Sequence, residues 1–187
     1  MAIQITKIIG PDFLKEYVKK INSNVDNDLI ELSIIESQDI NLQPILGSNL
    51  YNKILDDVDG DVLTGVYLTL VDDFCLKVII YNTLRRITTE LLIKYDNKSI
   101  SEYDGDNSKP VSLELLKFKL SQINNDTQFY EERLRNHLLE EGNNLYTEYD
   151  TESGLDEMKV NKNTAYFSGM DVTSRSRFSC RNKYIRY

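Results

Sequence analysis

The chain has 187 residues, of which 41% are hydrophobic, and a formal net charge of −8 at pH 7. This length is enough for one domain with a buried core, and the apolar content excludes a fully disordered chain. The acidic balance excludes a protein that binds polyanions over its whole surface. The charge is unevenly distributed, however: residues 172–187 hold five basic residues and no acidic one, so residues 1–171 carry a net charge of −13.

Two helices are predicted before the first sharp corner of the chain. The first begins at Gly10-Pro11-Asp12, which is a typical helix start, and its apolar residues recur at a spacing of three to four. A polar break over residues 22–28 precedes the second helix, which runs to about Ser37 and continues brokenly toward Ile40. The residues expected to face the core are Phe13, Tyr17, Val18, Ile21, Leu29, Ile30, Leu32, Ile34 and Ile35.

A proline and a glycine then predict a tight corner. Pro44 disfavours helix in the residue before it and can restart one. Gly47 permits a positive φ or a close approach of another segment, and Ser48 or Asn49 can cap a short helix over residues 49–57. Three side chains of this region are expected to pack beneath the next long helix, namely Leu46, Leu50 and Tyr51.

Four aspartates lie around Gly60 in the sequence DDVDGD. A calcium-binding loop needs acidic residues at alternate positions, a central glycine and a distal glutamate. Here no glutamate ends the loop, and apolar Leu63 and Val66 follow it. We therefore predict a polar turn between two helices, and metal binding by Asp56, Asp57, Asp59 and Asp61 is the alternative interpretation.

Two long helices are expected in the middle of the chain. Over residues 62–95, apolar residues recur at helical spacing on more than one stripe, which predicts a central helix. Residues 96–109 are polar and predict an exposed loop, and a second amphipathic helix is expected from Ser112 to near Gly142. Antiparallel packing would bury both stripes. The predicted fold class is all-α: a small helical bundle with two long antiparallel helices and an extended C-terminal arm.

The domain organisation predicted is a helical domain over residues 1–142 and an arm over residues 143–187. The last part of the arm lacks helical periodicity and is too poor in aliphatic residues to form a core, so it either stays disordered or orders against a partner. Interleaved aromatic and basic residues favour a partner, since these residue types anchor interfaces. The expected contact residues are Arg175, Arg177, Phe178, Arg181, Lys183, Tyr184, Arg186 and Tyr187.

Residues that carry catalysis are scarce in this chain. The one histidine, His137, lies in a charged helical segment, where we expect it to be solvated or partly packed. No G-x-S-x-G motif and no glycine-rich phosphate loop occur. Cys75 is expected in the core, and with the distant Cys180 it makes neither a disulfide framework nor a zinc site. No run approaches the ~20 apolar residues that span a bilayer. We predict a protein that is not an enzyme and uses no cofactor.

The segment QDINLQPILGSNLY, residues 38–51, resembles the head–tail connector (adaptor) proteins of tailed bacteriophages, particularly the ring proteins of short-tailed crAss-like phages that infect Bacteroides. In that family a glutamine precedes P-x-L-G-x-x-L-Y, and the motif lies between an early helix and a short helix that leads to two long ones. The resemblance covers roughly residues 10–140. The residues that carry it are Gln38 or Gln43, Pro44, Leu46, Gly47, Leu50 and Tyr51.

This resemblance implies a structural virion protein. Such subunits form a ring, usually a dodecamer, below the portal protein, where the ring extends the DNA channel and docks tail or other ring proteins. It implies assembly in the bacterial cytoplasm and a final location at the head–tail interface. The charge distribution fits, because acidic walls repel the phosphates of DNA that passes through without specific binding, while the basic arm can grip a neighbouring subunit or the portal.

Other functions are compatible with parts of the sequence. The principal alternative is a helical module whose arm binds nucleic acid, with basic residues on phosphates and Tyr184 or Tyr187 stacked on bases. The acidic body opposes this by long-range repulsion, and no basic helix-turn-helix face is evident. Further alternatives are a metal-dependent hydrolase that uses the Asp56–Asp61 cluster and a general assembly or regulatory protein.

Overall fold

The computed structural model describes residues 6–18, 21–91, 93–96, 99–102, 112–149 and 158–162. Its α-helices are α1 (Pro11–Tyr17), α2 (Asn27–Ser37), α3 (Gln43–Leu46), α4 (Ser48–Asp59), α5 (Gly65–Leu70), α6 (Leu76–Glu90) and α7 (Leu113–Leu145). Two π-helical turns, η1 (Gln38–Leu42) and η2 (Val71–Cys75), join α2 to α3 and α5 to α6. Two short strands, β1 (Ile93–Asp96) and β2 (Ser99–Glu102), lie between α6 and α7. The predicted all-α class is confirmed.

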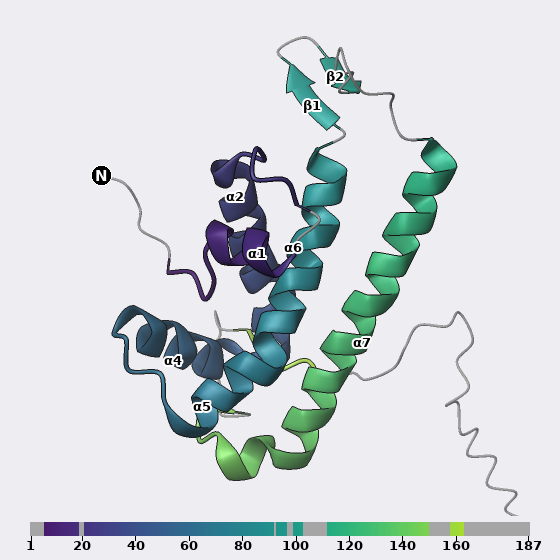
Figure 1. Ribbon diagram of the computed structural model, residues 1–187. Coiled ribbons are helices and arrows are strands. Elements are labelled where there is room, and N and C mark those ends of the chain that lie inside the picture. Colours follow the sequence, from purple (N-terminus) through teal and green to yellow (C-terminus); the bar gives the residue numbers. More distant parts are fainter. Residues whose placement is uncertain are drawn as a thin grey trace, which may run out of the picture.

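Helices α6 and α7 are the long antiparallel pair that the periodicity predicts, and they lie side by side (Figure 1). Phe74, just before α6, stacks on His137 with ring centroids 4.2 Å apart, and Tyr81 within α6 stacks on Tyr130 at 4.8 Å. The order of these contacts is reversed between the two helices, which makes the pair antiparallel. Burial of both apolar stripes is the main stabilising term for helices of this kind.

The region between the two long helices differs from its prediction. The helix expected to reach residue 95 ends at Glu90, and the expected loop contains strand β2, which pairs antiparallel with β1. A hairpin reverses the chain while its backbone N–H and C=O groups remain paired. Ile93 and Tyr95 also belong to residue types that favour strands, so local helical spacing was a misleading signal here.

Three apolar residues predicted for the core, in α1 and α2, are exposed instead. Helix α1 is short, and it buries Leu14 completely while Phe13 and Tyr17 stack on each other at the surface. In α2, Leu32 is 56% exposed, whereas Ile30 and Ile34 are fully buried. A short helix presents only one narrow stripe to its neighbours, so apolar side chains beyond that stripe remain in water.

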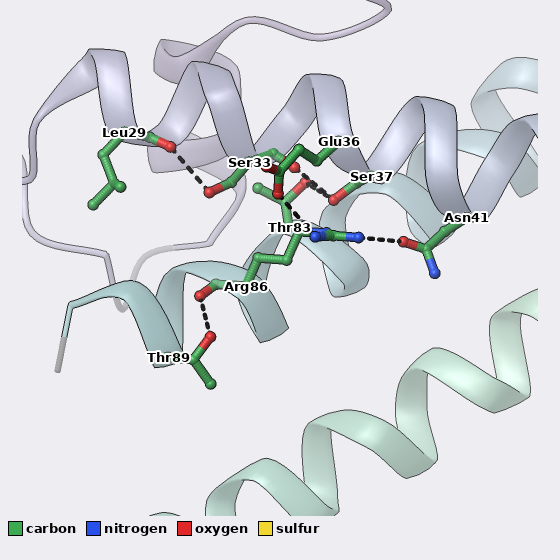
Figure 2. Close-up of polar contacts among 8 residues, drawn as sticks. All are labelled: Leu29, Ser33, Glu36, Ser37, Asn41, Thr83, Arg86 and Thr89. Atoms are coloured by element: carbon green, nitrogen blue, oxygen red, sulfur yellow. Dashed lines mark hydrogen bonds and ion pairs between the residues drawn. The ribbon is translucent and has the colours of Figure 1, made fainter. Parts of the chain in front are cut away.

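A line of polar side chains joins α2 and η1 to α6 (Figure 2). The Thr83 hydroxyl donates to Ser37 Oγ (3.1 Å), and Ser37 Oγ donates to the Ser33 carbonyl (2.6 Å). Arg86 donates to the Glu36 carboxylate (2.8 Å) and to Asn41 Oδ1 (3.3 Å). Ser33, Ser37 and Thr83 are buried, so these bonds hold the two helices in one register.

Candidate functional site

The proline–glycine corner is built from η1, α3 and the start of α4. Gln43 is helical, which corrects the prediction that Pro44 would keep its predecessor out of the helix. Pro44 lies in the first turn of α3, where a helix needs no N–H from it. Gly47 then turns the chain with φ 77° and ψ 159°. Leu46 and Leu50 are fully buried and Tyr51 is 4% exposed, all within the core that α6 also lines.

A segment from near the C-terminus, residues 158–162, lies across this corner. The Ser48 amide donates to the Met158 carbonyl (3.0 Å), and the Asn161 amide donates to the Pro44 carbonyl (2.7 Å). Val160 lies over Gly47: a Cβ atom added to that glycine would lie 2.7 Å from Val160 Cγ2. The expected close approach at Gly47 is therefore confirmed, and its cause is this segment.

The side chain of Ser48 has a different role from the one predicted. It does not cap α4; its Oγ accepts a hydrogen bond from the Met158 amide (2.9 Å) and one from Gln43 Nε2 (3.3 Å). Ser48 thus pairs with Met158 through its backbone N–H and its side-chain oxygen. Ser48 is 5% exposed, so these partners satisfy a buried hydroxyl.

Gln38, which precedes the proline and the glycine of the corner, binds the N-terminal segment, residues 6–8. Gln38 is fully buried, its Oε1 accepts from the Ile8 amide (2.8 Å), and its Nε2 donates to the Thr6 carbonyl (3.3 Å). One amide side chain therefore satisfies two backbone groups of residues 6–8. No local sequence signal marks this contact, because Gln38 lies between the polar residues Ser37 and Asp39. The resemblance included Gln38 without a stated role.

Tyr51 connects the corner back to η1. Its hydroxyl donates to Asp39 Oδ1 (2.7 Å), and burial together with this bond raises the pKa of Tyr51 well above its usual range. We call residues 38–51 the corner motif. It fastens two segments from opposite ends of the chain to one buried structural unit, and this is its observed role.

The chain returns toward the corner motif after α7. That helix ends at Leu145, beyond the end expected near Gly142, and Tyr146 and Tyr149 are buried in the helical core. Gly142 permits the return, since a Cβ atom there would lie 2.5 Å from the Tyr149 ring. Tyr67 of α5 donates to Glu148 Oε2 (2.6 Å) and fixes the turn. Residues 146–149 thus pack on the body instead of extending away from it.

His137 is partly packed, as predicted. It stacks on Phe74, and its Nε2 lies 3.0 Å from the Tyr146 hydroxyl. Burial lowers the pKa of His137 from its ordinary value of 6.5, although Glu141 and Glu140 oppose the shift. The neutral imidazole is therefore the form that the fold prefers, and its partners are an aromatic ring and a hydroxyl.

The unfolding free energy is expected to fall as the pH drops below about 6.5, since the unfolded chain then binds a proton at His137 that the folded chain resists. The His137→Gln variant, which cannot titrate, should lack this decline. Urea unfolding at several values between about pH 7.5 and 5.5 measures it without interference from ordinary carboxyl groups. The chain has one histidine, so the decline is assigned to His137. An equal decline in the variant would contradict this assignment.

The predicted turn between α4 and α5 begins at Gly60: Asp56, Asp57 and Asp59 lie in the last turn of α4, and of the four aspartates only Asp61 lies in the turn itself. The Gly60 amide donates to the Asp56 carbonyl (2.9 Å), and Asp61 has a positive φ of 52°, a conformation that aspartate tolerates. Asp57 is 8% exposed and forms an ion pair with Lys53. In the described ranges, no group of three or more His, Cys, Asp or Glu side chains is placed to hold a metal ion.

The predicted arm residues, Arg175 to Tyr187, lie outside the described residues, as does Cys180. Cys75 is fully buried in the core, as predicted, and burial raises the pKa of its thiol. Sequence reasoning missed the docking of residues 158–162, because the only local signals are one valine and one methionine in a polar stretch. No helix of the described part is both long and apolar enough to cross a membrane.

Comparison with known proteins gives one match. Neither a curated protein nor a solved structure matches the chain. Residues 42–157 match a family described as a family of unknown function, DUF6712. This range begins at the last residue of η1, includes α3 to α7, and covers more than half of the chain. The chain is therefore a member of the DUF6712 family.

Proposed function

We propose that this protein is a structural subunit of a virion, a connector that forms a ring, usually of twelve copies, below the portal and extends the DNA channel. The observation that carries the proposal is the anchoring of residues 158–162 on the corner motif. Because of this anchoring, the basic aromatic arm that follows Lys162 starts from a defined point on an acidic helical body.

The charge distribution supports the same function. Residues 1–171 carry −13 and residues 172–187 carry five basic side chains. Negative channel walls keep DNA mobile, since each phosphate contact would add salt-dependent affinity. Single exposed ion pairs contribute little, but ring symmetry repeats each arm contact in every subunit.

Mass photometry of the full chain, alone and with the portal protein of the virus that encodes it, tests the proposal. We expect a ring or a stoichiometric complex with the portal, with a monomer allowed before the portal is added. Absence of any complex with portal or tail proteins would overturn the proposal.

Deletion of residues 172–187 tests whether the basic aromatic end of the arm is needed for assembly. Ring formation and portal binding are expected to be lost, while the thermal unfolding midpoint stays unchanged because the core and the corner contacts lie within residues 6–162. A truncated chain that still assembles would show that the arm does not hold the complex together.

A filter-binding series at increasing salt separates the nucleic-acid alternative from the connector. A connector is expected to retain DNA weakly and without sequence preference, whereas a nucleic-acid-binding module should show tight retention with a steep salt dependence.

A further inference from the structure

A groove of about 410 Å³ lies between the N-terminal segment, the turn after α4, and η2. Its volume is within the ~300–1,000 Å³ range of ligand pockets. The walls are largely apolar, and two of the side chains that form them, Phe13 and Leu68, are each 41% exposed. Exposed apolar surface next to a groove is typical of an interaction site. The apolar side chains that line it include Ile8, Phe13, Val58, Leu63, Leu68 and Leu76.

Carboxylates also line this groove. Asp61 and Asp72 are exposed, and Asp57 contributes a third carboxylate that is paired with Lys53. Among the described residues that line the groove, there is no lysine, arginine or histidine. The site therefore combines an apolar floor with a negative rim, which suits a segment that carries both aromatic rings and positive charges.

We propose that this groove receives the last part of the C-terminal arm, residues 172–187, of a neighbouring copy of the chain. In the arm, three aromatic residues each follow directly after a basic one: Arg177-Phe178, Lys183-Tyr184 and Arg186-Tyr187. Each such pair places a ring into apolar surroundings while the adjacent charge reaches a carboxylate at the rim. The inference rests on the proposed function, in which assembly brings copies of the chain into contact.

The position of the arm's origin is compatible with this contact. Residues 158–162 are fixed beside Ser48, at the start of α4, and the groove lies at the other end of that helix, about 18 Å away. Residues 163–171 span up to about 30 Å when extended. Residues 163–171 are therefore long enough to carry the basic aromatic stretch to a groove on the same body or on a neighbouring one, and the proposed assembly of copies favours the neighbouring one.

Residues 1–5 are the competing occupant, because they immediately precede the N-terminal wall of the groove. Their sequence, MAIQI, has apolar side chains but no basic one. These side chains are able to cover the floor, but none of them carries a positive charge to pair with Asp61 and Asp72. Charge complementarity therefore favours the arm.

Photo-crosslinking of the full chain tests the inference. A Tyr184→p-benzoylphenylalanine chain is mixed with an isotopically heavy copy, with and without the portal protein, and crosslinked peptides are identified by mass spectrometry. We expect light–heavy crosslinks to residues 8–13 and 57–76. Crosslinks that lie only within one chain, map to other surfaces or are absent under both conditions would overturn the inference.

A matched pair of variants tests the role of charge. Asp72→Lys is expected to reduce groove crosslinking by at least about twofold to fivefold, the range for loss of one exposed ion pair, because the new lysine also repels the basic residues of the arm. Asp73→Lys changes the adjacent exposed aspartate, which does not line the groove, and should leave the crosslinking unchanged. Equal effects of the two variants would show a general charge effect and contradict the groove as the site.

Failure of this inference is distinguishable from failure of the proposed function. Complexes with the portal whose crosslinks map elsewhere would overturn the groove and retain the connector function. Groove crosslinks between copies that form neither a ring nor a portal complex would retain the groove and overturn the connector function.

Discussion

Replacing Gly47 by alanine is expected to lower the free energy of unfolding and to release residues 158–162 from the corner motif. With φ 77° and ψ 159°, this residue adopts a conformation that essentially only glycine tolerates, which costs another residue about 1–3 kcal/mol. The new Cβ atom would also lie 2.7 Å from Val160 Cγ2, which adds a steric cost. Urea unfolding measures the first effect, and faster hydrogen exchange of the Asn161 amide, which now donates to Pro44, measures the second.

Two control variants separate the backbone cost from the clash. Gly65 also has a positive φ of 61°, but a Cβ atom there would meet nothing within 4 Å, so Gly65→Ala reports backbone strain alone. Adding Val160→Ala to Gly47→Ala removes the clashing methyl group and should restore part of the lost protection at Asn161. If Gly47→Ala left the exchange of residues 158–162 unchanged, the close approach would not be what requires glycine.

Replacing Leu50 by alanine is expected to destabilise the protein by about 2–5 kcal/mol, the range for a large side chain removed from a close-packed core. Leu50 is fully buried on the first turn of α4 and belongs to the core that also includes residues of α6 and α7. A loss of this size is a large fraction of the ~5–15 kcal/mol that stabilises a typical domain. Chemical unfolding of the full chain measures it.

Leu32→Ala provides the matched control for this prediction. The same side chain is removed, but Leu32 is 56% exposed on α2, so the change should stay within about 0.5 kcal/mol. Similar losses in the two variants would contradict the assignment of Leu50 to the core and of Leu32 to the surface.

The presence of a helix was predictable wherever apolar residues at helical spacing extended regularly over many turns. The two long helices were predicted from stripes such as Val78 and Leu134, and both residues are fully buried. Short elements were less predictable, since in α1 the residues Phe13 and Tyr17 have helical spacing but face water. Spacing identifies a face of a helix, but which neighbour covers that face depends on how the helices pack.

The corner motif was predictable in its backbone and not in its contacts. Gly47 predicts a bend through the positive φ that it allows, and the structure has one there. The break predicted at Pro44 is absent, because Gln43 and Pro44 continue the helical run from η1. That Ser48 binds Met158, which lies 110 residues later in the chain, has no local signal. The same holds for Gln38, whose partners are backbone groups of residues 6–8.

The sequence by itself determined the all-α class, the two long amphipathic helices, the glycine corner and the separation of an acidic body from a basic arm. These properties depend on backbone preferences, periodicity and side-chain charge, which act over a few neighbouring residues. Only the tertiary structure decided that the corner motif binds segments from both ends of the chain and that an acidic groove forms at the far end of α4. Such contacts join residues far apart in sequence, and they depend on the packed arrangement of the whole body.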